Sequence, residues 1–430
     1  MLSFLKKFIS NDFFLRLWYH KFFTFFSALL YGFPAKNMIV IAVTGTDGKT
    51  STCTLIHSIL KSSGYKVGLA STTRFAIGDE EWVNETHKTT LGRFYLQKLL
   101  FRMKKEKCTH LVLEVSSHAL SQGRIIGIPV DTAVITNISR EHLDFHKTLK
   151  NYKKAKLKLF KKLASSRKLK SVEKVSVCNL DDKSYIDILK IKADKYIGYG
   201  IDNTVSNMNN NIAKDIVCSS RSTSFKFTLD KEYFVNMPLI GGYNVYNALA
   251  AISSVLSFGV SGDDIVKGLE SVSIVPGRFE IISDKDIIIA IDYAVTENAF
   301  EKLFNTARSI VGDKKVISVF GSCGDRDNGK RSFLGKISSE LCDISIITDE
   351  EPYTEDPSVI RKMIISGIDK GEWYEEADRR LAIRKAISLA NTGDIILVTG
   401  MGDQTTMIVG DEKIDWSDRK VIEEELKYRE

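Results

Sequence analysis

This 430-residue sequence lacks paired cysteines, late histidines and long apolar runs. Its six cysteines show no CxxC spacing and no paired pattern, which excludes a recognisable zinc motif or disulfide framework and favours a reducing, cytoplasmic setting. No internal stretch is apolar over the length that a membrane-spanning helix needs. All seven histidines lie between His20 and His146, so chemistry that depends on imidazole belongs to the N-terminal part.

The composition is that of a globular protein, with 43% hydrophobic and 27% charged residues. The length predicts two or three domains. The net charge is +7, but the lysines are scattered among carboxylates. This excess suits an anionic small substrate or general solubility, and without a dense basic stripe we expect no nucleic-acid partner.

An aromatic segment, Phe13 to Phe33, opens the sequence and is interrupted by Arg16, His20 and Lys21. It has the character of a helix. The charges argue against a signal peptide and against a spanning helix. Two alternatives stay open, a helix buried against the rest of the protein and a helix that lies on a membrane surface.

Beyond residue 38, strand-like and helix-like runs alternate, which predicts an α/β protein with a doubly wound, mostly parallel sheet. Met38–Val43 is expected to be a buried strand and Lys49–Ser63 an amphipathic helix. Ser224–Leu229 and Tyr233–Met237 are expected to form a hairpin attached to this sheet. A second alternation follows the break at Val275-Pro276-Gly277. We therefore expect an N-terminal helical segment (1–37), a central domain (38–275) and a smaller Rossmann-like α/β domain (276–430).

The strongest local signal is Val43-Thr44-Gly45-Thr46-Asp47-Gly48-Lys49-Thr50-Ser51, between the apolar strand and the helix. Its glycines let the backbone wrap a triphosphate, and amides at the helix start face the anion. Lys49 can reach the terminal phosphates, and the Thr50 hydroxyl can hold magnesium. The sequence thus predicts a P-loop ATPase domain. A chance glycine turn is the alternative.

Several motifs together resemble the Mur ligases, and among them the muramyl-tripeptide synthetases that add the third residue of the stem peptide. Gly45–Ser51 resembles their GTxGKT[ST] loop, which folylpolyglutamate synthases share, with Asp47 in place of the usual asparagine. The run Leu113–Leu120 (LEVSSHAL) closely resembles their signature. Similar matches are TNISREHLDFH (136–146), with Glu141 in place of the usual aspartate, NYKKAK (151–156), GYNVYNA (242–248), VPGRFE (275–280) and FGSCGDRDNGKR (320–331).

The resemblance implies an enzyme that uses ATP and two magnesium ions. Implied metal ligands are Thr50, Glu114, His142 and Lys156, the last one carbamylated. Glu114 also ends a predicted strand, where doubly wound sheets place ligands. Alone, His142 would as readily be structural, and Lys156 would be one of many solvated lysines. The residues implied to be catalytic are Lys49, His142, Lys156 and Arg278.

The same resemblance assigns the remaining contacts. The implied ATP-binding residues are Gly45, Thr46, Asp47, Gly48, Lys49, Thr50, Ser51, Asn244, Asn247, Arg278 and Asp292. Thr89, Thr90, Ser116, Gln122 and Arg124 would contact the muramyl-peptide acceptor. Arg326 would receive the carboxylate of the incoming amino acid. Arginine suits phosphate and carboxylate partners because its planar fork binds two oxygens.

Three departures bear on substrate choice. Val295 stands where the family has histidine, in DYAV for DYAH. Glu350-Glu351-Pro352-Tyr353 replaces the DNPR of diaminopimelate-adding members, and GMGDQ (400–404) replaces GKGHE. The charges that would hold a second zwitterionic centre are lost, which puts diaminopimelate in question. Lysine could use Asp349, Glu350 and Glu351 as countercharges, although solvated surface carboxylates explain them equally well.

The resemblance covers residues 38–430. Family members carry an N-terminal domain that binds the uridine nucleotide, and here only the aromatic segment precedes the loop. This prompts the hypothesis of a monomeric enzyme at the inner face of the membrane, with residues 1–37 touching the membrane surface.

The function expected from these motifs is ATP-dependent amide-bond formation between an amino acid and a muramyl-peptide carboxylate. Two rivals stay open. One is another ATP-dependent amide ligase, such as a folylpolyglutamate synthase. The other is an ATP-binding regulatory or scaffold protein that has lost ligation, because a fold does not guarantee a function.

Overall fold

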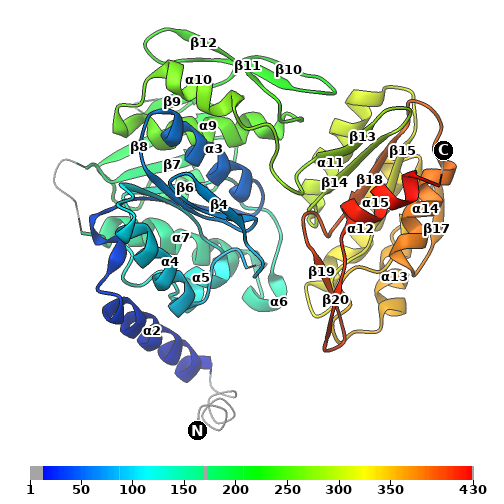
Figure 1. The fold of residues 1–430 in the computed structure, drawn as a ribbon, viewed down its shortest axis with the longest axis horizontal. Coiled ribbons are helices and arrows are strands. Elements are labelled where there is room, and N and C mark those ends of the chain that lie inside the picture. Colours follow the sequence, from blue (N-terminus) through cyan, green and yellow to red (C-terminus); the bar gives the residue numbers. More distant parts are fainter. Residues whose placement is uncertain (1–12, 87, 168–171, 207, 429–430) are drawn as a thin grey trace.

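The computed structural model describes residues 13–86, 88–167, 172–206 and 208–428, with side chains described from Trp18 onward (Figure 1). Two α/β halves lie side by side, each built on its own sheet. The helix α2 (Phe13–Leu30) lies along the outside of the first half, followed by a short 3-10 turn, η1 (Pro34–Asn37).

The first half is built on a nine-stranded sheet with the order β4-β3-β2-β5-β1-β6-β7-β8-β9. All of its pairs are parallel except β2–β3 and β3–β4. The strands are β1 (Ile39–Thr44), β2 (Val67–Ala70), β3 (Arg74–Ile77), β4 (Glu80–Val83), β5 (His110–Glu114), β6 (Thr132–Ile135), β7 (Val175–Asn179), β8 (Lys195–Gly200) and β9 (Asn209–Ile212).

Helices cover both faces of this sheet, which explains why its central strands are apolar throughout. One layer holds α3 (Lys49–Ser62), α9 (Tyr243–Val255), which continues into η2 (Leu256–Phe258), and α10 (Gly262–Glu270). The other holds α4 (Arg93–Lys105), α5 (Ser117–Gln122) and α7 (Leu149–Ser165). Two single-turn helices, α6 (Leu143–His146) and α8 (Tyr185–Ile188), complete this half.

The expected hairpin is present, but it is not part of the large sheet. Its strands β11 (Thr223–Thr228) and β12 (Glu232–Met237) join β10 (Lys214–Cys218) in a separate antiparallel sheet. Alternate side chains of β12 are buried, and they pack into the same core as α10. The alternation therefore predicted the hairpin correctly, while its attachment depends on packing over the helix layer.

The second half is a six-stranded sheet with the order β13-β14-β18-β15-β16-β17, antiparallel only at β13–β14. The strands are β13 (Glu280–Asp284), β14 (Ile288–Asp292), β15 (Val316–Phe320), β16 (Ile344–Ile347), β17 (Glu372–Glu375) and β18 (Ile395–Thr399). The helices α11 (Glu297–Val311), α12 (Arg331–Leu341), which follows η3 (Asn328–Lys330), and α13 (Pro357–Ile365) cover one face. The other face carries α14 (Arg379–Leu389) and α15 (Asp418–Leu426), and a small hairpin consists of β19 (Thr406–Val409) and β20 (Glu412–Asp415).

The N-terminal helix packs on the protein through one face, as the first of the two alternatives expects. Thr24, Ser27 and Ala28 are fully buried against the protein, whereas large apolar side chains on the opposite face are exposed. Among the described residues, no helix combines the length and the hydropathy needed to cross a membrane.

A buried ion pair joins two strand ends of the first half and allows a test of its packing. The Nζ of Lys174 lies 2.5 Å from Oδ1 of Asp131, and Oδ2 of Asp131 accepts a 2.9 Å hydrogen bond from the Val40 amide. Asp131 is fully buried and Lys174 nearly so. Removing the carboxylate would leave the buried ammonium of Lys174 without its counter-ion, which is strongly destabilising.

We predict that Asp131→Ala lowers the melting temperature by about 10 °C in scanning calorimetry, as expected when a buried charge loses its partner in a domain of this size. Asp187→Ala is the control, because that carboxylate pairs with Lys153 and Lys190 at the surface. A melting temperature for Asp131→Ala that equals that of the control would contradict this account.

Candidate active site

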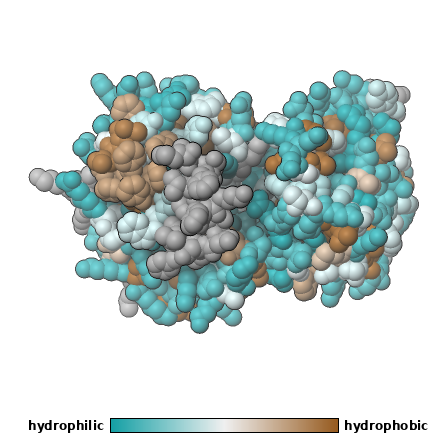
Figure 2. Space-filling model, turned by 90° about the horizontal axis from the view of Figure 1, so that it is seen from below, coloured by the Kyte–Doolittle hydropathy of each residue, from teal (hydrophilic) through white to brown (hydrophobic). Residues whose placement is uncertain are grey.

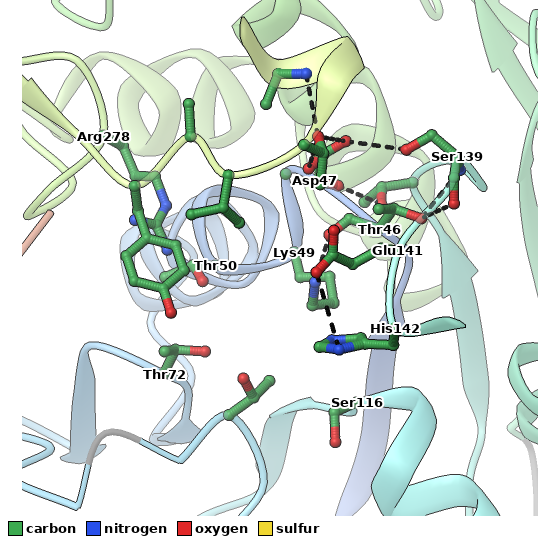
Figure 3. Close-up of a pocket in the computed structure, with 18 of the residues that line it drawn as sticks. Thr46, Asp47, Lys49, Thr50, Thr72, Ser116, Ser139, Glu141, His142 and Arg278 are labelled. Atoms are coloured by element: carbon green, nitrogen blue, oxygen red, sulfur yellow. Dashed lines mark hydrogen bonds and ion pairs between the residues drawn. The ribbon is translucent and has the colours of Figure 1, made fainter. Parts of the chain in front are cut away.

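A single cavity of about 960 Å³ lies between the two halves and is lined by both. Its wall on the first half comes from the carboxyl ends of β1, β2, β5 and β6, where a doubly wound sheet binds ligands. Its wall on the second half comes from the ends of β14 and β15 and the loops beyond them. Figure 3 shows the side chains of Lys49, Thr50, Thr72, Ser116, His142 and Arg278 around a common space.

The glycine-rich loop closes tightly over the start of α3. Gly48 precedes the helix with φ of 78°, a conformation that side chains rarely adopt, and a Cβ there would lie 2.2 Å from Oδ1 of Asn247. The loop residues Thr46, Asp47, Gly48, Lys49, Thr50 and Ser51 line the cavity. Gly45 lies behind them, packed against Thr136. The loop therefore brings Lys49 and the start of α3 to the cavity wall, as phosphate binding requires, whereas the amides of Thr46 and Asp47 donate to the carbonyl and Oδ1 of Asn137.

Glu114 brings a buried carboxylate to the end of β5, next to the loop. The hydroxyl of Thr50 donates to its two oxygens at 3.1 and 3.2 Å. Thr72 donates twice more, from its amide at 2.8 Å and its hydroxyl at 2.9 Å. Thr50 and Glu114, predicted from distant motifs, are thus direct neighbours in the cavity wall. Hard oxygen ligands of this kind suit magnesium.

Two lysines approach the loop from opposite sides. Lys49 donates to the carbonyl of Thr46 at 2.7 Å and lines the cavity. Lys156 is 1% exposed, donates to the carbonyl of Gly45, and lies with Nζ 4.3 Å from the centre of the Tyr152 ring. Burial, and next the positive charge of Lys49, lower the pKa of Lys156 well below its ordinary value. Burial therefore favours the neutral amine of this side chain over the ammonium.

His142 also lines the cavity, in a left-handed conformation with φ of 55°. Burial lowers its pKa to about 2, with further contributions from His118 and three lysines. Its Nδ1 has no hydrogen-bond partner and lies 3.9 Å from Glu141 Oε1. The neutral imidazole is the form that binds metals, so this buried nitrogen fits the predicted role.

Within the described residues, no three His, Cys, Asp or Glu side chains form a metal centre by themselves. The donors found at the loop are one hydroxyl, one carboxylate and one imidazole, and Lys156 adds none in its amine form. They fit a magnesium ion that takes its remaining ligands from phosphate oxygens and water.

The predicted acceptor residues line the first half beside Glu114. Thr90 donates from its hydroxyl to the Glu114 carbonyl at 3.1 Å and accepts from the Ser116 amide at 3.0 Å. Arg124 donates to the Thr90 carbonyl at 2.9 Å. Thr89, Thr90, Ser116 and Arg124 line the cavity. Gln122 does not; its Oε1 accepts from Nε of Arg124 at 2.9 Å and so orients that guanidinium.

The predicted nucleotide contacts from both halves also meet here. Asn247 lines the cavity and donates at 2.9 Å to Asn244, which itself lies behind it. Arg278 stacks 4.8 Å from the centre of the Tyr293 ring and also lines the cavity. Asp292 accepts from the Phe279 amide at 2.7 Å, and burial raises its pKa to about 6, against the opposing charge of Arg278.

The second half contributes a polar corner around Arg326, whose guanidinium carbon lies 5.5 Å from the centre of the Tyr353 ring. Tyr353 donates to Oε2 of Glu351 at 3.2 Å. Burial, and next the charge of Glu350, raise the pKa of Glu351. Arg326, Glu350 and Glu351 line the cavity.

The position of Asp349 differs from that expected of a substrate-binding residue. Its carboxylate is outside the cavity lining and is ion-paired with Arg361. Asp349 therefore has its countercharge within the protein and is not placed to bind a substrate cation.

Some lining residues were not predicted as site residues. Thr72 donates hydrogen bonds to the Glu114 carboxylate. The sequence feature that could have indicated it is a run of three hydroxyl residues directly after β2. Thr296 and Asn298 reach from the second half to Asp47, with oxygen and nitrogen distances of 3.2 and 3.4 Å. Lys330 lies 3.5 Å from Glu141 across the same junction. Such partners depend on how the halves meet, which no local pattern reports.

This fold and cavity define a class, the nucleotide-dependent ligases built from a P-loop half and a second α/β half. Comparison with known proteins names the family. The Mur ligase middle domain matches residues 43–255, and the Mur ligase glutamate ligase domain matches residues 277–402. The chain belongs to the Mur ligase family, the ATP-dependent amide ligases of peptidoglycan synthesis. The resemblance inferred from the motifs is confirmed.

Individual relatives support this assignment. The chain is 39% identical to the UDP-N-acetylmuramoyl-L-alanyl-D-glutamate–2,6-diaminopimelate ligase of Clostridium botulinum, over 93% of this chain and 80% of that protein. A solved structure of a ligase with the same name is 29% identical, with a TM-score of 0.63 over 95% of this chain and 82% of the other. A Mycobacterium tuberculosis folylpolyglutamate synthase shares the fold, with a TM-score of 0.69 at 18% identity over 87% and 90% of the two chains.

Proposed function

We propose that this protein joins an amino acid to the carboxylate of a muramyl-peptide acceptor, at the expense of ATP, as a step in peptidoglycan precursor synthesis. The observation that carries the proposal is the shared cavity, which holds the phosphate loop, the acceptor residues beside Glu114 and the corner around Arg326. Three sequence relatives carry the name UDP-N-acetylmuramoyl-L-alanyl-D-glutamate–2,6-diaminopimelate ligase, which agrees with a muramyl-peptide acceptor. The fold alone would allow a folylpolyglutamate synthase, but the sequence relatives favour the muramyl acceptor.

In this proposal residues 38–275 and 276–430 are the two working domains, joined at Gly277. This glycine has φ of 65°, and a Cβ there would lie 2.4 Å from the Asp403 amide, so only glycine fits the junction. Contacts of Asp47 with Thr296 and of Glu141 with Lys330 hold the domains together over the cavity. A closed cavity keeps water from a reactive acyl phosphate.

The chemistry proceeds in two steps. An acceptor carboxylate oxygen attacks the γ-phosphorus of ATP, the bond to ADP breaks, and an acyl phosphate forms. The amine of the amino acid then attacks the acyl carbon, loses its proton, and expels inorganic phosphate to leave an amide. Lys49 and Arg278 hold the phosphate charge, and Arg326 receives the carboxylate of the amino acid. Positioning and charge stabilisation supply the catalysis.

Magnesium, bound by Thr50 and Glu114 at one position and by His142 at a second, would neutralise phosphate charge. Lys156 fits the second position if its amine reacts with CO2 to form a carbamate. Its burial supports this step, because burial favours the neutral amine, which is the form that reacts with CO2. The carbamate oxygens would then give magnesium the hard anionic donor that it prefers over nitrogen.

The incoming amino acid is proposed to carry one cationic side-chain end, as lysine does. Glu351 and Glu350 give the corner around Arg326 negative charge, and Tyr353 fills the position of the arginine in the DNPR pattern. A second carboxylate on the substrate, as in diaminopimelate, would lie beside these carboxylates without the arginine that pattern supplies.

We place the enzyme in the cytoplasm, as a monomer at the inner face of the membrane.

Lys49→Ala tests the proposed reaction. We predict that release of ADP in the presence of ATP, magnesium, an amino acid and a soluble muramyl-dipeptide acceptor falls at least about a hundredfold, because the phosphate charge loses its fixed cation. Lys61→Ala, at the other end of the same helix, should leave the rate unchanged. Full activity of Lys49→Ala would refute the role of the loop.

The carbamate at Lys156 predicts a spectroscopic signal. Protein incubated with ¹³C-bicarbonate should show a carbamate resonance that is absent in Lys156→Ala, and this variant should lose ligation. Short carboxylic acids should restore part of its rate, because they return an anionic oxygen to the site. The control is Lys158→Ala, an exposed neighbour on the same helix. A wild-type spectrum without the resonance would remove the carbamate from the mechanism.

A panel of lysine, ornithine, diaminopimelate and neutral amino acids tests the choice of substrate. We predict that lysine or ornithine supports faster ADP release than diaminopimelate. Glu351→Gln should raise the KM for the cationic amino acid about tenfold or more, since a hydrogen bond to a charged partner is lost. Glu340→Gln, at the surface of α12, should change nothing. Preference for diaminopimelate would contradict the assignment of this corner.

A further inference from the structure

The helix α2 turns its large apolar side chains away from the protein. Its inner face carries Thr24, Ser27 and Ala28, all fully buried. Its outer face carries Trp18, Phe22, Phe25, Phe26, Leu29 and Leu30, with exposed fractions from 47% to 67%. Figure 2, seen from below, shows a brown, hydrophobic area on this side of the first half. An apolar face of this size on a soluble surface marks an interaction site.

This face is held firmly on the protein. The guanidinium of Arg93 on α4 lies 5.3 Å from the centre of the Tyr19 ring and 6.0 Å from that of Phe23. The hydroxyl of Ser27 donates to the Arg93 carbonyl at 3.4 Å. At the end of the helix, the rings of Tyr31 and Phe101 lie 5.7 Å apart. The outer face is therefore presented in a fixed orientation rather than as a frayed end.

Three helices on this side of the molecule are basic. The sequences of α2, α4 and α7 contain two, five and seven lysines and arginines and no aspartate or glutamate. α2 contacts α4 and α5, and α5 contacts α7, so the three helices share one side of the molecule. Lys21 of α2 lies against the end of α5, where a Cβ on Gly123 would be 3.0 Å from its Cγ, and Lys158 and Lys161 are exposed on α7, which packs on α5. Cations from two helices thus lie close together without a carboxylate in either helix.

We propose that α2 and the lysines beside it form a docking surface for a bilayer of anionic phospholipid. Aromatic side chains settle at the level of the headgroups, and lysines around them attract the negative surface, which is the pattern of helices that lie in the membrane interface. The proposal rests on the location at the inner face of the membrane proposed above. It adds that the surface binds anionic lipid headgroups.

Vesicle sedimentation tests the docking surface. The full-length protein is mixed with vesicles of pure phosphatidylcholine, or of equal parts phosphatidylcholine and phosphatidylglycerol. We expect it to sediment with the mixed vesicles, to release in high salt, and to stay in solution with the neutral ones. Phe22→Ser with Leu29→Ser, and separately Lys158→Glu with Lys161→Glu, should each reduce the bound fraction at least about fivefold.

Matched variants lie elsewhere on the surface. Val217→Ser with Phe234→Ser removes two exposed apolar side chains from the small sheet, and Lys420→Glu with Lys427→Glu reverses two charges on and next to α15. Both should bind like the wild type. Equal binding to both kinds of vesicle, no binding to either, or equal loss in the matched variants would overturn the proposal.

Two other occupants are distinguishable. If single-stranded poly(U) binds through Lys158 and Lys161 while vesicles do not, the face is a nucleic-acid surface and the proposal fails. If Phe22→Ser with Leu29→Ser converts a dimer to a monomer in sedimentation velocity, the face joins two copies and the proposal fails. Amino-acid-dependent ADP release with a soluble acceptor should persist in all four variants, so a failure of docking and a failure of ligation are separate results.

Discussion

Glu114 places a carboxylate in a fully buried position, and the rest of the site is arranged around it. A buried anion is costly unless hydrogen bonds or cations satisfy it. Here Thr50 and Thr72 donate to its oxygens from the start of α3 and the end of β2. The carboxylate thereby joins three segments that are distant in sequence. Its backbone carbonyl accepts from Thr90, which extends the same network to the acceptor residues.

The departures from the family pattern lie together across the domain junction. Asp47 stands in the place of an asparagine, and its carboxylate accepts hydrogen bonds from Thr296 and Asn298. These two residues closely follow Val295, the valine that replaces the family histidine. Glu141 stands in the place of an aspartate and faces Lys330. Burial raises the pKa of Glu141, and Lys330 is the main opposing cause. Each of these two altered residues in the first half thus has a partner in the second.

What the sequence predicted well is local. The apolar run before the loop and the glycines within it require only neighbouring residues, and β1 and α3 begin within one residue of their expected positions. The strands β3 and β4, at one side of the large sheet, were missed because they are short and only partly apolar. The burial of Lys156 was not predictable from a helix with seven lysines, since only the packing of α7 against the loop singles it out. The ion pair of Asp349 was not predictable for the same reason, because its partner Arg361 lies on another element, α13.

The proposed docking surface and the proposed acceptor residues share one short helix. Ser116 caps the start of α5 by accepting from the Ala119 amide at 3.2 Å, and Gln122 ends it next to Arg124. At that end, a Cβ on Gly123 would lie 3.0 Å from Cγ of Lys21 on α2. A bilayer bound by α2 would therefore lie on the side of the molecule that carries the acceptor residues, whereas the amino-acid corner belongs to the other half.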